Sequence, residues 1–320
     1  MLKSFRSAAF LAAALACATP AAAANLKATV SQAFQSMLYL PLYVALDEGL
    51  FEKAGIDVTK ETAGAPSVAL SAVISKSAQF SLHGPEWTAV AASKGAPVNI
   101  ICNVVNGAAV WIAATPDFPF KEAKDLKGQT IVAGLMPTTS TSLFLKYLKE
   151  NGMAKDDVNI TQVQIGTEPG PFLAGQAKVA VMYEPGLDQA VAKGMKVLVG
   201  FPQHYGAYAF SAISARKDVD PATAQAFVNG LQAALVLMKT DQAKAIAVAK
   251  KEFPTLDPAV VEAAVKRMMA EKVYPETADI SPDALKVGLD TQIALGNLAA
   301  QPDYATFVRR SFIEKAIAGN

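Results

Sequence analysis

The sequence predicts an α/β protein made of two lobes of similar topology, with a ligand cleft between them. Over the first 200 residues, short strand-like runs alternate with helix-like segments, which is typical of parallel sheets covered by helices. The order of elements also repeats: Pro66 and Pro85 open turns whose equivalents, at Pro169 and Pro185, follow roughly 100 residues later. After Gly200 the pattern becomes almost purely helical.

The first lobe is expected to contain strands separated by helices. The run from Leu38 to Lys53 has apolar residues at helical spacing and ends before Gly55. In chain order, strands are predicted at residues 26–30, 56–59, 80–82 and 98–105, and helices at residues 38–53, 68–75 and 88–94.

The second lobe repeats this order. Strands are predicted at residues 130–133, 158–163 and 179–182, and helices at residues 142–150 and 171–175. One returning strand is then expected at residues 208–214, and further helices at residues 221–240, 242–253, 258–271, 282–299 and 304–317.

The helical tail is interpreted as scaffold that completes and covers the first lobe. Asp220, Asp257 and Ser281 are expected to act as helix N-caps there. The expected boundaries are residues 25–112 plus 208–320 for lobe one and residues 113–207 for lobe two. The chain should cross between lobes near residues 107–113 and 202–211, and we expect these crossings to form the hinge.

Residues 1–24 are typical of a secretory signal peptide. Lys3 and Arg6 precede an apolar stretch too short to span a membrane, and a run of alanines offers a cleavage site near Ala24. Lipid attachment at Cys17 is not expected, because Ala14 stands where such a signal has leucine. The sequence therefore predicts an exported protein, periplasmic if the source is Gram-negative.

Composition and motifs exclude several classes of function. The formal net charge is +1 without a basic block, so nucleic acid is not an expected partner. Two cysteines and two histidines are too few for a histidine-rich metal site, and we expect neither a metal nor a cofactor. No phosphate-binding loop, nucleophile elbow or zinc-protease motif occurs, so no catalytic residue is predicted. We expect a monomer that binds a small molecule.

Polar and aromatic residues follow the predicted strands, where open α/β sheets bind their ligands. The candidate ligand-binding residues are Gln35, Tyr39, Ser67, His83, Glu86, Trp87, Asn106, Thr138, Thr139, Ser140, Thr141, Tyr183 and Glu184.

The hydroxyl run from Thr138 to Thr141 is the sharpest local feature. It precedes a predicted helix, whose start presents unpaired N–H groups and a partial positive charge. The run is therefore expected to contact an acceptor or anionic group of the ligand, and helix capping alone is the alternative.

Aromatic and acidic residues in the other cleft loops favour a different ligand group. Trp87 and Tyr183 offer stacking surfaces, with a buried Trp and a surface Glu as the alternative interpretation of the turn at residues 83–87. Glu86, Glu168 and Glu184 favour hydrogen-bond donors, and no arginine falls in a predicted cleft loop. A small planar organic solute is favoured, and an aliphatic sulfonate is the second candidate.

Several segments together resemble the substrate-binding proteins of ABC transporters, in the branch that binds alkanesulfonates, taurine, nitrate and thiamine-pyrimidine precursors. The matching segments are residues 39–45, 49–51, 54–58 and 125–128, Phe172 with Gly175, and Glu184 with Pro185. The resemblance implies a type II periplasmic-binding fold with two crossovers and a cleft between the lobes. It also implies delivery of the solute to a permease and an ATPase of the inner membrane.

Two alternatives remain under this resemblance. An enzyme of the same fold could act on a pyrimidine precursor, although the cysteine-rich run of such enzymes is absent. A sensory protein that presents a ligand would share the cleft and differ only in its partner.

Overall fold

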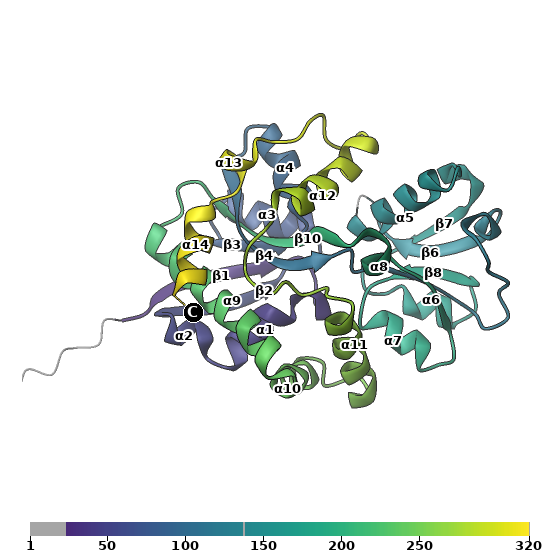
Figure 1. Cartoon of the computed structure of the whole chain (residues 1–320), viewed down its shortest axis with the longest axis horizontal. Helices are drawn as coiled ribbons and strands as arrows, with labels where there is room; N and C mark the ends of the chain where they lie inside the picture. Colours follow the sequence, from purple (N-terminus) through teal and green to yellow (C-terminus); the bar gives the residue numbers. More distant parts are fainter. Residues whose placement is uncertain (1–23, 137, 320) are drawn as a thin grey trace, which may run out of the picture.

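Two five-stranded sheets, each covered by helices on both faces, lie end to end along the long axis of the molecule (Figure 1). The computed structural model describes residues 24–136 and 138–319. The predicted signal peptide, apart from Ala24, and Cys17 lie outside these residues. Within them, no helix combines the length and hydropathy needed to cross a membrane.

The first sheet has the strand order β2-β1-β3-β10-β4. Its strands are β1 (Leu26–Gln32), β2 (Ile56–Thr62), β3 (Phe80–His83), β4 (Val98–Gly107) and β10 (Ala207–Arg216). Strand β1 runs parallel to β2 and β3, whereas β10 is antiparallel to both β3 and β4.

The second sheet repeats the topology in the order β7-β6-β8-β5-β9. Its strands are β5 (Trp111–Ala114), β6 (Thr130–Gly134), β7 (Asn159–Val163), β8 (Val179–Met182) and β9 (Lys196–Gly200). Here β5 occupies the antiparallel fourth place that β10 takes in the first sheet. The predicted α/β fold with two lobes of one topology is thus confirmed, although β5 and β9 were not predicted as strands.

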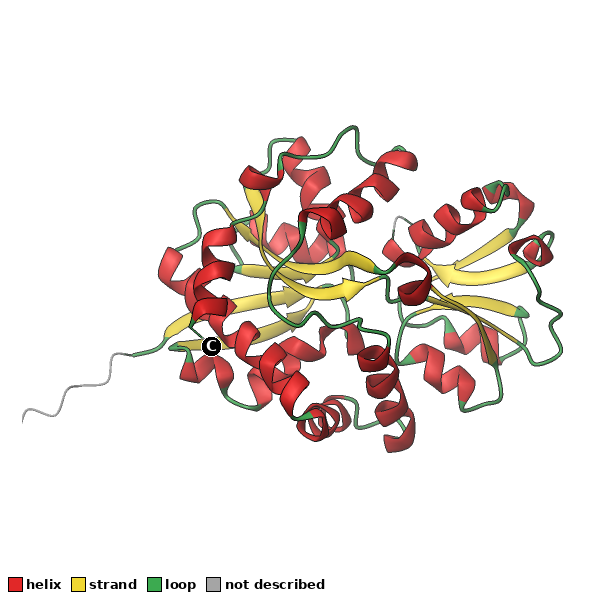
Figure 2. Ribbon diagram, in the orientation of Figure 1, coloured by secondary structure: helices red, strands yellow, loops and turns green. Residues whose placement is uncertain are grey.

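The helices lie on both faces of each sheet (Figure 2). In the first part of the chain they are η1 (Met37–Tyr39), α1 (Leu40–Asp47), α2 (Leu50–Lys53), α3 (Pro66–Ile74), α4 (Pro85–Ser93), η2 (Ala123–Leu126), α5 (Thr139–Glu150), η3 (Lys155–Asp157), α6 (Pro169–Leu173), α7 (Gly186–Val191) and α8 (Phe201–Tyr205). The tail forms α9 (Pro221–Thr240), α10 (Gln242–Glu252), α11 (Pro258–Ala270), α12 (Pro282–Ala294), α13 (Tyr304–Phe307) and α14 (Arg310–Ala318).

One expected helix is broken in two. The apolar periodicity predicted a single helix over residues 38–53, but Gly49 adopts a φ of +63° between α1 and α2. This left-handed backbone is accessible to glycine at little steric cost, so the chain turns there and α2 starts on a new axis.

The chain crosses between the two sheets twice. It passes from β4 to β5 through residues 108–110, and it returns from β9 through α8 into β10. Trp111, the first residue of β5, is fully buried, and its indole N–H donates to Glu271 Oε2 at 2.9 Å. The crossings are therefore held by packing and by a contact from the tail.

The first helix of the tail packs on the helices of the first lobe. The side chains of Asp220, Asp257 and Ser281 accept hydrogen bonds from helix N–H groups and cap α9, α11 and α12. Phe227 of α9 packs between Phe51 and Phe80, with ring centroids 4.9 and 4.1 Å away. The tail also contacts the second lobe, where α11 packs on α7 and α12 on α5, and sequence patterning did not indicate this.

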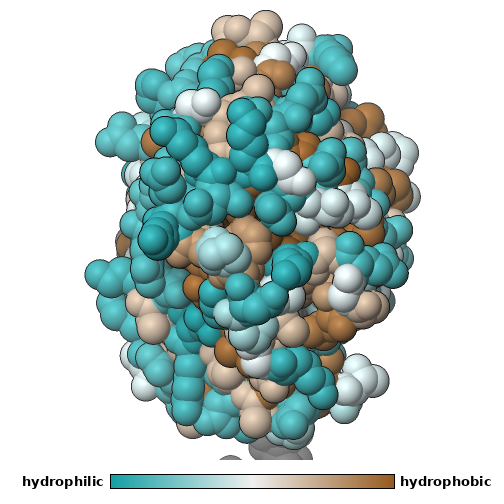
Figure 3. All heavy atoms as spheres, turned by 90° about the vertical axis from the view of Figure 1, so that its right-hand side faces the viewer, coloured by the Kyte–Doolittle hydropathy of each residue, from teal (hydrophilic) through white to brown (hydrophobic). Residues whose placement is uncertain are grey.

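The outer end of the second lobe is covered mainly by hydrophilic side chains, with hydrophobic ones scattered among them (Figure 3). Two of the exposed hydrophobic residues of this lobe are Leu173 and Val197. Single apolar residues of this kind are normal on a protein surface.

Replacing Gly230 with alanine is expected to destabilise the first lobe. A Cβ atom at Gly230 would lie 2.4 Å from Phe51 Cδ1, inside the aromatic stack. We expect a loss of about 1–3 kcal/mol in the free energy of unfolding, from overpacking. Urea denaturation measures it. Gly170→Ala is the control, since nothing lies within 4 Å of its Cβ position; equal effects of the two changes would contradict the packing argument.

Candidate ligand-binding site

Aromatic side chains from both lobes meet where the carboxyl ends of the two sheets face each other. Tyr183, which follows β8, stacks on Phe34 of the first lobe with ring centroids 5.7 Å apart. Its other neighbour is Phe210 of β10, edge-on at 5.9 Å, and Phe34 also contacts Tyr39 at 5.4 Å. Tyr208 contacts Phe210 at 6.0 Å. These rings form an apolar wall around a few polar groups.

Glu86 brings a carboxylate to this wall from the first lobe. It lies in the first turn of α4, and its Oε1 accepts a hydrogen bond from the Thr139 hydroxyl of the second lobe at 2.7 Å. Burial raises the pKa of Glu86 to about 7, and the Thr139 hydrogen bond opposes that shift. No ion pair to Glu86 forms within the described residues. Its charge is therefore uncompensated.

Glu168 brings a second carboxylate, from the second lobe. It is the residue before α6 and is only 1% exposed. Its Oε1 has no hydrogen-bond partner in the part of the chain that the structure describes. Burial raises the pKa of Glu168 to about 7. An unsatisfied buried carboxylate oxygen is costly, and native proteins keep few such atoms.

The hydroxyl run is buried and largely engaged within the protein. The Thr141 hydroxyl donates to Gly134 O at 2.7 Å, and the Thr138 and Ser140 hydroxyls are 3.2 Å apart. The Ser140 N–H, at the start of α5, donates to the Tyr183 hydroxyl at 2.9 Å. Two hydrogen-bond donors at this helix start are thus already engaged: the Thr139 hydroxyl donates to Glu86, and the Ser140 N–H donates to Tyr183.

Glu184 has a different environment from Glu86 and Glu168. Arg267 of α11 lies beside it, with Nε 3.0 Å from Glu184 Oε1, and Arg267 Nη2 is 2.6 Å from Asp188 Oδ1. The backbone carbonyl of Glu184 accepts from the Ser36 hydroxyl of the first lobe at 3.0 Å. Arg267 is not part of a cleft loop, but α11 carries it across to the second lobe, a contact that the interpretation of the loops alone did not include.

His83 is buried behind the site, within the first lobe. Its Nδ1 lies 2.9 Å from Gly84 O, which can only accept, so Nδ1 carries the proton and Nε2 accepts from the Ser81 hydroxyl at 2.9 Å. Burial lowers the pKa of His83 to about 4. Both ring nitrogens have partners inside the lobe.

Three other candidates, Trp87, Ser67 and Asn106, lie away from the cluster of rings and carboxylates, whereas Gln35 lines a groove between the lobes that reaches it. Trp87 is partly buried against Leu70, Val73, Ala78 and Val98 between α3 and α4. Ser67 is exposed at the start of α3. Asn106 accepts from Asn103 Nδ2 at 3.1 Å and lines a separate groove. Gln35 is exposed and donates to the carbonyl of Glu252 at 3.0 Å.

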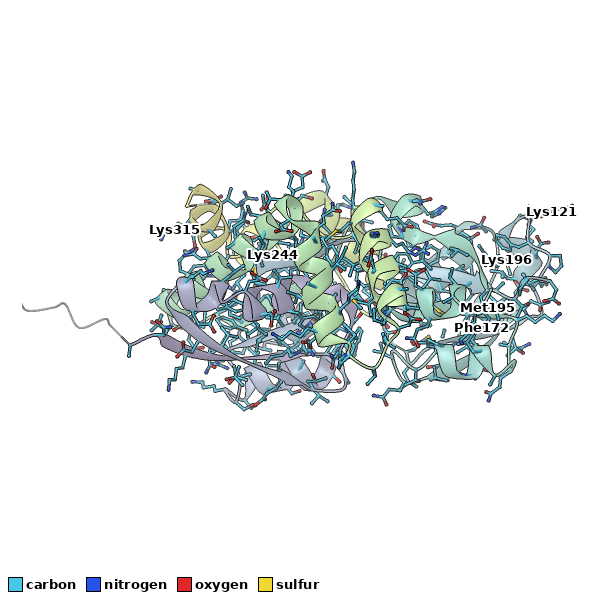
Figure 4. The ribbon with its side chains drawn as sticks, turned by 90° about the horizontal axis from the view of Figure 1, so that it is seen from below. Lys121, Phe172, Met195, Lys196, Lys244 and Lys315 are labelled. Carbon is cyan, nitrogen blue, oxygen red and sulfur yellow. The ribbon has the colours of Figure 1, made fainter. Side chains whose placement is uncertain are left out.

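A groove of about 480 Å³ leads from the surface to this cluster, and both lobes line it. Phe34 and Glu252 belong to the first lobe, and Glu168, Tyr183 and Gln189 to the second. Lys121 and the partly buried Lys196 lie at the distal end of the second lobe, and Lys315 lies at the opposite end of the molecule (Figure 4).

Three residues of β10 belong to the cluster but were missed from the sequence. Tyr208 and Phe210 contribute rings, and the Ser211 hydroxyl is hydrogen-bonded to that of Tyr39. They fall within the predicted strand at residues 208–214. The position of this strand in the sequence could have indicated them: it starts where the chain crosses between the lobes, so its first residues must lie beside the cleft.

Two sheets of this topology, joined by two crossings around a shared cluster, define the class of two-lobed solute-binding folds. Residues 37–245 match the family described as NMT1/THI5-like, and the chain belongs to that family. This agrees with the resemblance seen in the sequence.

Individual relatives point the same way. "Putative binding protein YtlA" of Bacillus subtilis (strain 168) is 25% identical over 269 residues, covering 81% of this chain and 78% of its own length. The periplasmic aliphatic sulphonate binding protein SsuA from Escherichia coli has a TM-score of 0.74 at 17% identity, covering 90% of this chain and 99% of that one. SsuA from Xanthomonas axonopodis pv. citri, bound to MOPS, has a TM-score of 0.71 at 20% identity, covering 89% and 98%. These two structures establish a shared fold.

Raising the pH should destabilise the ligand-free protein through Glu86 and Glu168. Their pKa values rise from 4.5 when unfolded to about 7 when folded, so the folded state binds more protons in that window. Each carboxyl group should lower the free energy of unfolding by up to about 3 kcal/mol once the pH exceeds 7, and it should have no such effect below about pH 4. Glu86→Gln and Glu168→Gln should each gain stability over the wild type as the pH rises, measured by urea denaturation. The exposed Glu61→Gln is the control; parallel pH profiles for all four proteins would contradict this account.

Removing Arg267 should loosen the contact between the lobes. Arg267→Met leaves the buried Glu184 and Asp188 without their positive partner. Breaking such a pair costs about 3 kcal/mol or more, and opening the lobes would rehydrate both carboxylates. We expect a larger radius of gyration in small-angle scattering. Lys266→Met, which removes a surface pair with Glu262, is the matched control and should leave the radius unchanged.

Proposed function

We propose that this chain is the extracytoplasmic solute-binding protein of an ABC importer. It binds a small organic solute between its lobes and delivers it by closure about the two crossings. The observation that carries the proposal is the cluster of rings and carboxylates to which both lobes contribute, next to a groove that opens to solvent. Ligand sites of this kind are concave and largely apolar, with a few convergent polar groups.

The solute favoured by the site is a small, mostly planar molecule. Phe34, Tyr39 and Tyr183 offer ring faces or edges, and Glu86 and Glu168 offer acceptors. An aliphatic sulfonate is the alternative, favoured by the fold shared with the two SsuA proteins. Fold by itself does not determine the ligand.

Transport fits the residues better than catalysis of a pyrimidine precursor. Cys102 is fully buried in β4, and burial raises the pKa of its thiol. The buried His83 has partners for both nitrogens. Neither residue is placed to act as a nucleophile or a general base.

The partners follow from this role. A binding protein of an importer meets the permease and its ATPase at the inner membrane, and it works in the periplasm after removal of a signal peptide near Ala24. The monomeric state expected from the sequence belongs to the same proposal.

Binding should close the lobes. The solute can be released by denaturing protein isolated from its native periplasm and then identified by mass spectrometry. Returned to refolded protein, it should bind one to one with micromolar affinity, about 8 kcal/mol, and reduce the radius of gyration. Binding in calorimetry with an unchanged radius would argue against closure about the crossings.

A further inference from the structure

We propose that the solute is a nitrogen cation held between Glu86 and Glu168, one carboxylate from each lobe. The amidinium group, with its planar head and several N–H donors, is the form that suits the site best. This inference rests on the proposed function and names the chemical class of its ligand.

Both carboxylates lack a positive partner although both are buried. Within residues 24–136 and 138–319, the ion pairs of the cleft join Arg267 to Glu184 and Asp188, and Lys60 to Glu252. Neither Glu86 nor Glu168 takes part in an ion pair there. A buried charge is normally paired or neutralised, so these two positions are arranged for a positive group that the protein does not supply.

The free oxygen of Glu168 faces the site. Its Oε1 lies 3.2 Å from the Cβ position of Gly134, with Ser140 Oγ and Thr138 Oγ1 each 3.4 Å from that same point. Glu168 also lines the groove through which a solute would enter. The unpartnered oxygen thus lies beside the hydroxyls at the start of α5, and its residue lines the groove that opens to solvent.

Tyr183 connects the two carboxylates. Its hydroxyl accepts from the Ser140 N–H, the neighbour of Thr139 that binds Glu86, and Ser140 Oγ lies near the same point as Glu168 Oε1. Burial raises the pKa of Tyr183, and the charges of Glu168 and Glu86 add to that rise. Its ring stacks on Phe34 and meets Phe210 edge-on. Aromatic faces attract cations through their quadrupole, and a planar cation could lie against these rings while donating to a carboxylate on either side.

An anion would be poorly placed in the same position. A helix start often binds anions, but at α5 the Thr139 hydroxyl donates to Glu86 and the Ser140 N–H donates to Tyr183. A sulfonate there would face two carboxylates, and the nearby guanidinium of Arg267 is already engaged by two others. The fold shared with the sulfonate-binding SsuA proteins therefore presents two carboxylates at this place.

Placing one carboxylate on each lobe also explains how binding would drive closure. Without a ligand, bringing the lobes together dehydrates Glu86 and Glu168, and the hydrogen bond from Thr139 to Glu86 is the only inter-lobe compensation among the described residues. A cation that donates to both carboxylates offsets that cost only when the lobes are together. The binding free energy is thus realised in the closed form, which is the requirement for a ligand to shift a conformational equilibrium.

The test compares probes of equal shape and different charge. Benzamidine, benzamide and benzoate form one series, and acetamidine, acetamide and acetate a smaller one, with taurine as the sulfonate. Calorimetry on the full mature chain measures the affinities. We expect the amidinium to bind most tightly in at least one series and the carboxylate least. Tighter binding of benzoate, acetate or taurine, or no binding of either amidinium, would overturn the proposal.

Variants then locate the interaction. Glu86→Gln and Glu168→Gln should each reduce the preference for amidinium over amide roughly ten- to a hundredfold, as expected for a charged hydrogen bond. The exposed Glu61→Gln should leave the preference unchanged. An undiminished preference in both site variants would overturn the assignment. Scattering separates this from the proposed function: an anion that binds and compacts the protein refutes only the cation, whereas binding without compaction refutes the closing cleft.

Discussion

The cost of burying a carboxylate without a positive partner is the constraint on which the inter-lobe boundary depends. Glu86, Glu168 and Glu184 all lose water where the lobes meet, and each raised pKa has desolvation as its largest cause. A protein stabilised only by its core would place leucine or phenylalanine at such positions. Three acids at this boundary therefore reduce the net stabilisation that the contact between the lobes provides.

The molecule compensates these acids in two ways. Glu184 and Asp188 share Arg267, which arrives on α11 from the tail of the first lobe. This pair holds the lobes together from within the protein. Glu86 is hydrogen-bonded by the Thr139 hydroxyl but has no positive partner, and one oxygen of Glu168 has no partner among the described residues. The boundary thus combines an ion-paired contact through Arg267 with two carboxylates, Glu86 and Glu168, that have no positive partner among the described residues. A ligand that interacts with these two carboxylates would offset the free-energy cost of burying them.

The fold was more predictable from the sequence than the site. Alternating periodicity and repeated turns are local signals, and they were sufficient for the two lobes and for the caps at Asp220, Asp257 and Ser281. Strand β5 was missed because residues 108–114 continue the apolar run of residues 98–105 with only Asn106 and Gly107 between them. Position after a strand selected Trp87 and Asn106 as candidates, but helix α4 turns Trp87 into the lobe. Contacts such as Thr139 with Glu86, or Arg267 with Glu184, join residues of opposite lobes, and no local pattern encodes them.

Two acidic side chains set the electrostatic character of the centre of this boundary. The start of α5 meets the start of α4 there, so Glu86 of α4 lies where it offsets the partial positive charge at the start of α5. Here Glu86 reaches Thr139, and Glu168 approaches from the side of α6. Two acidic side chains therefore offset the partial positive charge of this helix start. Changes of this size leave the fold intact, which is why overall structural similarity to sulfonate-binding proteins carries little information about the charge of the solute bound here.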